Sequence, residues 1–124
     1  MERTILVVED NDMNRSLVKD VLALGGYEIL EARNGSEGVR LAREHLPDLI
    51  LMDVQMPVMN GMTATKILKA DSRTRAIKII SLSAYAVDVT PEEFLQTGFD
   101  DYLSKPLNIH TLTDKVRQFL VGGK

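Results

Sequence analysis

The chain has 124 residues, of which 44% are hydrophobic and 27% charged, and it contains no cysteine. This length and composition are typical of one soluble globular domain with a full apolar core. The lack of cysteine excludes thiol catalysis, disulfides and cysteine-ligated zinc. A net charge of −3 argues against a nucleic-acid surface, and the apolar start of the chain is too short for a signal peptide or membrane span. We therefore expect a cytoplasmic protein without nucleic-acid or membrane partners.

Short apolar runs alternate with amphipathic segments along the whole chain. Four runs are rich in Ile, Leu or Val and are bounded by turn residues, which is typical of buried parallel strands. A fifth run is weak and is predicted from its place in the alternation. The five predicted strands are Ile5–Val8, Tyr27–Ala32, Leu49–Met52, Ile77–Leu82 and Tyr102–Leu103.

The first two segments between these runs have helical periodicity. An apolar stripe in each is expected to face the core, and each helix has a clear stop. Gly25-Gly26 ends the first helix, and Pro47 ends the second. The predicted stripes are Met13, Leu17, Val21 and Leu24 in the first helix, and Val39, Ala42 and Leu46 in the second.

Three more helices follow. The third spans roughly Met62 to Ala70. The fourth begins at Thr90-Pro91-Glu92-Glu93, where an N-cap residue, a proline at the first helical position and a capping-box glutamate coincide, and it ends at Gly98. The fifth has one apolar face made of Ile109, Leu112, Val116, Phe119 and Leu120.

This alternation predicts an α/β fold, with a five-stranded parallel sheet in a doubly wound (βα)5 arrangement and helices on both faces. Two strand orders fit the pattern, and the periodicity does not choose between them. In a parallel sheet the carboxyl ends of the strands meet at one edge, where ligands bind.

Polar residues follow four of the predicted strands at that edge. They are Glu9-Asp10, Asp53, Ser83 and Ser104-Lys105-Pro106. One Asp after a strand is more often a helix cap or a turn former. Polar residues at the ends of four strands together favour a functional site.

Three close carboxylates stay ionised together only if a cation lies among them. Hard oxygen ligands beside open solvent suit Mg²⁺, with Mn²⁺ as a substitute. A carboxylate can also act as a nucleophile and form an aspartyl phosphate. The metal and Lys105 would then neutralise the phosphoryl oxygens, and Ser83 could donate a hydrogen bond to one of them.

The segments VVEDN, DLILMDVQMPVMNG, LSAYA and GFDDYLSKP resemble the signature segments of response-regulator receiver domains. The resemblance covers essentially the whole chain and implies one receiver domain over residues 1–124 with the flavodoxin-like strand order 2-1-3-4-5. It makes Asp53 the phosphoacceptor, with Lys105 and Ser83 as the other catalytic residues.

The resemblance also assigns the remaining site residues. The metal ligands would be Glu9, Asp10, Asp53 and the main-chain carbonyl of Gln55. Ser83 and Tyr102 would form the switch pair. The resemblance further implies that Ala84 leaves room for the phosphoryl group, that the Lys105–Pro106 bond is cis, and that Pro57 and Gly61 shape the loop after the acceptor.

The function implied is that of a phosphoryl-accepting signalling switch. A histidine kinase or histidine phosphotransfer protein would donate the phosphoryl group to Asp53. The receiver, a monomer or weak dimer, would then change its binding to a downstream protein through the fourth helix, fifth strand and fifth helix, or pass the group on. It would catalyse only its own phosphorylation and slow dephosphorylation.

Other interpretations remain open. The chain could be the receiver domain of a longer hybrid histidine kinase. A Mg²⁺-dependent phosphatase with an aspartyl nucleophile is disfavoured because Gln55 stands where such enzymes usually carry a general acid. A flavodoxin-like cofactor binder is disfavoured because aromatic residues make up only 5% of the chain and no phosphate-binding loop follows the first strand. A receiver that binds partners without phosphorylation is disfavoured because every chemical position is filled.

Overall fold

The computed structural model describes residues 3–54, 56, 58–83 and 91–120. Strands and helices alternate strictly along the chain, so the predicted (βα)5 arrangement is confirmed. The ten elements are β1 (Thr4–Val8), α1 (Asp12–Ala23), β2 (Glu28–Ala32), α2 (Gly35–His45), β3 (Leu49–Asp53), α3 (Gly61–Ala70), β4 (Lys78–Ser83), α4 (Pro91–Thr97), β5 (Asp101–Ser104) and α5 (Ile109–Leu120).

The five strands form one parallel sheet in the order β2-β1-β3-β4-β5. This is the order that the family resemblance implies. The strand order reverses between β1 and β3, so the loops that follow these two strands turn to opposite faces of the sheet. The crevice between those loops is the usual ligand site of such sheets.

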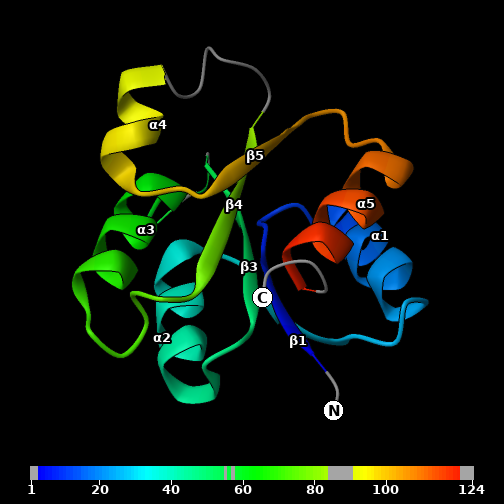
Figure 1. Cartoon of the computed structure of the whole chain (residues 1–124), viewed down its shortest axis with the longest axis horizontal. Helices are drawn as coiled ribbons and strands as arrows, with labels where there is room; N and C mark the ends of the chain where they lie inside the picture. The colour runs from blue at the N-terminus through cyan, green and yellow to red at the C-terminus, as the bar shows by residue number, and fades with distance from the viewer. Residues whose placement is uncertain (1–2, 55, 57, 84–90, 121–124) are drawn as a thin grey trace.

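Two apolar clusters cover the two faces of the sheet. Figure 1 shows α2, α3 and α4 on one face and α1 and α5 on the other. Within β1, Leu6 and Val8 pack on the side of α2 and α3, whereas Ile5 and Val7 pack on the side of α1 and α5. Because side chains alternate along a strand, a strand buried on both faces has a continuous apolar run, which is why the strand predictions succeed.

Helix α1 packs through a different face from the predicted one. Val18 and Leu22 are buried together with Arg15. Of the predicted stripe, Met13, Leu17 and Leu24 are 82%, 45% and 90% exposed, while Val21 is partly buried against the core. The segment contains two apolar rows, and the row of Val18 and Leu22 is the one buried against the sheet. The longer row, favoured by the sequence pattern, is wrong except for Val21.

Two other residues of the predicted stripes are also exposed. Leu46 is 54% exposed because it is the C-cap of α2 in the left-handed conformation, with φ 47°. Ile109, at the first position of α5, is 47% exposed. The rest of the α5 prediction is correct, since Leu112, Val116 and Leu120 are buried and Phe119 packs against them while half-buried.

The ends of α4 agree with the helix signals in the sequence. The helix begins at Pro91 and ends at Thr97. Gly98 follows with φ 101°, a backbone conformation that glycine adopts readily. Thr90, the predicted N-cap, lies outside the described residues. No helix among the described residues is long and apolar enough to cross a membrane.

Candidate phosphoryl-transfer and metal site

Three of the predicted side chains meet at the carboxyl edge of the sheet. Glu9 follows β1, Asp53 ends β3, and Lys105 follows β5. The ammonium Nζ of Lys105 lies 3.1 Å from Glu9 Oε1 and 3.2 Å from Asp53 Oδ1. Glu9 is fully buried and Asp53 is 4% exposed. These residues, far apart in sequence, therefore form one charged cluster at the end of the core.

Asp10 completes an acidic triad with Glu9 and Asp53. Each residue offers a carboxylate oxygen, and the three oxygens lie within 4.8 Å of one another. Asp10 is exposed, unlike the other two. The triad is therefore closed on the side of the sheet and open to solvent on the side of Asp10.

The loop after Asp53 folds back closely on its backbone. The N–H of Val54 donates to Leu82 O at 3.1 Å, and the N–H of Gly61 donates to Val54 O at 2.9 Å. A Cβ on Gly61 would lie against the main-chain oxygen of Asp53 and 2.9 Å from Met52 Cγ. Only glycine fits this approach, which supports the predicted role of Gly61 in shaping the loop; Pro57 lies outside the described residues.

The charge on Asp53 is opposed by its surroundings. Burial, the hydrogen bond with Glu9 and the charge of Glu9 raise the pKa of Asp53 to about 7, although Lys105 acts in the opposite direction. Burial would lower the pKa of Lys105, but Asp53 and Glu9 outweigh burial and raise it. The single ammonium group does not fully offset the buried acids.

The residues present fit a hard divalent cation. Glu9 Oε1 is buried and has no hydrogen-bond partner of good geometry among the described residues, although it lies near Lys105. A buried carboxylate oxygen of this kind is costly unless a cation or donor meets it. Three carboxylates at a solvent-open mouth match the ligand preference of Mg²⁺, which keeps several waters. The carbonyl of Gln55, the fourth predicted ligand, lies outside the described residues.

Three other predicted site residues lie on β4, on β5 and directly after β5. Ser83 ends β4 and pairs with Ser104 of β5. Tyr102 of β5 is 56% exposed, and its ring packs edge-on against Phe94 of α4, with centroids 5.9 Å apart. The Lys105–Pro106 peptide bond is cis, as predicted. Ala84 lies outside the described residues.

Arg15, which no sequence pattern above indicated, also lies beside the site. Arg15 is 8% exposed, and its guanidinium donates from Nη1 to Glu9 O at 2.9 Å and from Nε to Glu31 Oε1 at 3.2 Å. The signal was its spacing, because Arg15 shares one helical row with Val18 and Leu22. Choosing the other row as the buried one concealed it.

Comparisons with known proteins agree with this geometry. A family model described as the response regulator receiver domain matches residues 5–117. The polar-differentiation response regulator DivK of Brucella anthropi is 40% identical over 120 residues, which are 97% of this chain and 98% of that protein.

Solved receiver domains have the same fold. The receiver domain of a sensor histidine kinase from Pseudomonas aeruginosa, solved with a magnesium ion coordinated in its active site cleft, is 35% identical with a TM-score of 0.87, covering 95% of this chain and 97% of that one. The receiver domain of the Saccharomyces cerevisiae response regulator Ssk1, solved in complex with the histidine phosphotransfer protein Ypd1, is 29% identical with a TM-score of 0.86, covering 94% of this chain and 88% of that one.

Proposed function

Because the chain belongs to the response regulator receiver domain family, we propose that it is a phosphorylation-dependent switch whose phosphoacceptor is Asp53. The observation that carries the proposal is the position of Asp53 between two further acids and Lys105. A nucleophile, cation ligands and a fixed positive charge therefore lie within one cluster. Few other functions need all three together.

The reaction is transfer from a phosphohistidine. An Asp53 carboxylate oxygen forms a bond to phosphorus while the phosphorus–nitrogen bond to the donor imidazole breaks, and the imidazole leaves with the bonding electrons and takes a proton from solvent. Lys105, already 3.2 Å from Asp53 Oδ1, balances charge on the transferred oxygens. A bound Mg²⁺, held by Glu9, Asp10, Asp53 and the Gln55 carbonyl, would supply the remaining charge neutralisation. Hydrolysis of the acyl phosphate by water restores Asp53 and releases inorganic phosphate.

The phosphodonor would approach over the start of α1. Met13 lies one turn beyond Asp10 and is 82% exposed, and Leu17, one turn further on the same row, is 45% exposed. Exposed apolar side chains beside a charged site suit a protein partner. The Ypd1 complex of the similar Ssk1 receiver supports a histidine phosphotransfer protein, or the equivalent domain of a kinase, as that partner.

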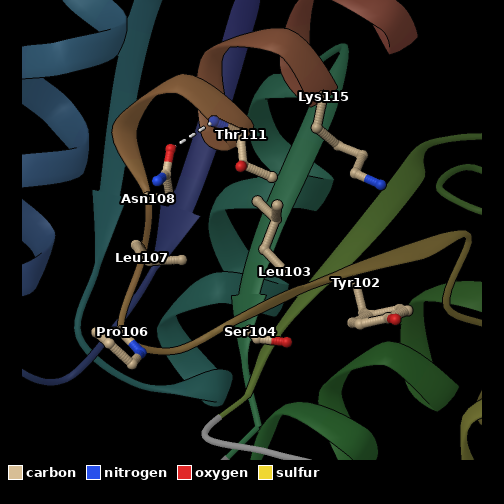
Figure 2. Close-up of a pocket in the computed structure, with 8 residues that line it drawn as sticks. All are labelled: Tyr102, Leu103, Ser104, Pro106, Leu107, Asn108, Thr111 and Lys115. Atoms are coloured by element: carbon tan, nitrogen blue, oxygen red, sulfur yellow. Dashed lines mark hydrogen bonds between the residues drawn. The ribbon is translucent and has the colours of Figure 1, made fainter.

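The output surface would lie along α4, β5 and α5. A pocket of about 300 Å³ opens there, between β5, the loop after it and α5. Figure 2 shows Tyr102 and Lys115 toward one end of this pocket and Pro106 and Leu107 toward the other. Lys115 is held by Asp101, with Nζ 3.0 Å from Oδ2. A downstream protein that binds here would sense the position of Tyr102, which with Ser83 forms the proposed switch pair.

The test is labelling by a small phosphodonor. We expect the wild-type protein to gain one phosphoryl mass from acetyl phosphate with Mg²⁺, and to gain none when EDTA replaces the metal. The Asp53→Asn variant should stay unlabelled, and the wild-type adduct should be removed by hydroxylamine, as acyl phosphates are. Labelling of Asp53→Asn to the wild-type extent would contradict the assignment of the phosphoacceptor.

A further inference from the structure

Arg15 is a charged side chain on the buried face of α1. Its three guanidinium nitrogens each have a partner: Nη1 donates to Glu9 O at 2.9 Å, Nε to Glu31 Oε1 at 3.2 Å, and Nη2 to Asp12 Oδ1 at 2.5 Å. Burial would lower the pKa of Arg15, but Asp12 and Glu31 outweigh burial and raise it. The side chain therefore stays charged and has one orientation.

One of these three bonds reaches the metal site. The carbonyl of Glu9 belongs to the peptide that joins Glu9 to Asp10, two members of the acidic triad. The N–H of Glu9 is bound on the other side by Ala32 O of β2 at 3.0 Å. Glu31, which orients the guanidinium, is the neighbour of Ala32 on that strand, and it pairs in register with Val7 of β1. Glu9 is thus held from both sides: its N–H, in the preceding peptide, is bound to the edge strand β2, and its carbonyl, in the Glu9–Asp10 peptide, is bound to α1.

We propose that Arg15 is a positioning residue for the divalent cation: its guanidinium holds the Glu9–Asp10 peptide so that both carboxylates converge with Asp53. This inference rests on the proposed function, because it concerns the same metal site. Arg15 touches none of the three carboxylates in the described contacts and acts only through the backbone. Residues that orient metal ligands in this way usually change metal affinity when they are replaced.

A positioning role and a purely electrostatic role of Arg15 predict opposite changes in cation affinity when the residue is replaced. Removing a positive charge near three carboxylates should by Coulomb's law strengthen cation binding. Removing the guanidinium that orients the Glu9 carbonyl should weaken cation binding. A lysine keeps the charge, but its ammonium is compact and cannot bond the three partners in the same fixed fork. Arg15→Lys therefore separates geometry from charge.

The experiment measures binding of the metal alone, without a phosphodonor. Mn²⁺ affinity would be followed by electron paramagnetic resonance and Mg²⁺ affinity by calorimetry, with folding checked by circular dichroism. We expect Arg15→Met to bind either ion about tenfold more weakly than wild type, and Arg15→Lys to remain several-fold weaker. The matched control is Lys19→Met, which removes a cation of α1 that pairs with the same Glu31, Nζ to Oε2 at 3.2 Å, but not with the Glu9 carbonyl. Its affinity should equal that of wild type or rise slightly.

Three results would overturn the proposal: Arg15→Met binding metal as well as wild type or better, Arg15→Lys matching wild type, or Lys19→Met losing as much affinity as Arg15→Met. If Arg15→Met does not fold, Arg15→Lys decides alone. Failure of the proposed function would look different, because the wild-type protein itself would then neither bind Mg²⁺ nor take a phosphoryl group. If wild type binds Mg²⁺ and is labelled by acetyl phosphate, these results test only the role of Arg15.

Discussion

At the scale of single residues, Asp53 is buried, yet the proposed reaction requires its carboxylate to be ionised. Its carboxylate lies beside Glu9, and only Lys105 supports ionisation among the groups that shift its pKa. A carboxylate with this environment costs stability whenever it is ionised in the folded protein without a cation. An ionised Asp53 therefore lowers stability, a cost that the proposed phosphoryl transfer would explain.

This trade predicts a pH dependence of stability for the metal-free protein. Asp53 titrates near its ordinary pKa when the chain is unfolded but at about 7 when it is folded. The folded state thus binds the extra proton between about pH 4 and pH 7, so the contribution of Asp53 to stability is intact below that range and is lost as the pH rises through it. Above pH 7, Asp53→Asn should be more stable than wild type by about 1–3 kcal/mol.

Urea unfolding in EDTA at pH 5, 6, 7 and 8 measures this difference. The difference in unfolding free energy between Asp53→Asn and wild type should increase with pH over this range. Mg²⁺ should reduce this difference by stabilising wild type selectively. If the difference in unfolding free energy stays constant from pH 5 to pH 8, Asp53 ionises normally in the folded protein.

At the scale of elements, α1 carries both structural and proposed recognition residues, on two different rows. The buried row of Val18 and Leu22 packs on the sheet. The exposed row of Met13 and Leu17 leads away from the acidic triad. When a helix has apolar residues on two sides, its periodicity does not show which side is buried. Its packing then depends on the rest of the fold.

Paired substitutions on α1 test which row supports the structure. Leu22→Ala should destabilise the protein by about 2–4 kcal/mol, because Leu22 is 1% exposed and its truncation leaves a cavity. Met13→Ala should change stability by less than about 0.5 kcal/mol while slowing phosphotransfer from a protein donor. Acetyl phosphate labelling of Met13→Ala should stay normal, since that donor is too small to use the surface. Equal destabilisation by the two substitutions would mean that α1 packs through the predicted stripe after all.

At the scale of the whole molecule, the proposed switch requires that phosphorylation at the sheet edge change the proposed output surface. The path proposed for it crosses two neighbouring strands. Ser83 ends β4 beside Asp53, since Leu82 pairs with Asp53, and Ser81 of β4 pairs with Tyr102 of β5. In this structure the ring of Tyr102 lies outward against Phe94 of α4. Movement of Ser83 toward a phosphoryl group would make space for Tyr102 to turn inward, which would release Phe94.

Beryllofluoride, a phosphoryl mimic, tests this coupling. In wild type we expect amide shifts at the site and also along Phe94–Gly98 and Asp101–Thr113. Ser83→Ala should still bind the mimic but lose most of the distant shifts, because it lacks the hydroxyl that we propose links the two regions. A Ser83→Thr variant, which keeps the hydroxyl, is the control and should retain them. Wild-type shifts in Ser83→Ala along these two segments would show that the signal takes another path.

The sequence by itself determined the element order, the fold class and which charged residues gather at the sheet edge. Strand and helix periodicity are local properties of the chain, and parallel strands necessarily bring their carboxyl ends to one edge. Glu9, Asp10, Asp53 and Lys105 could therefore be assigned to one cluster before any coordinates, and they do meet there. The strand order came from the family resemblance, because periodicity does not encode which strands are neighbours.

Only the tertiary structure decided which row of α1 is buried, how strongly Asp53 resists ionisation, and where Arg15 lies. Each depends on contacts between segments distant in sequence: α1 against the sheet, Glu9 against Asp53, and Arg15 against both the Glu9 carbonyl and Glu31. A pattern along the chain records the residue types but not the distances between them. Burial and pKa follow from those distances, so they appear only when the sheet and its helices are assembled.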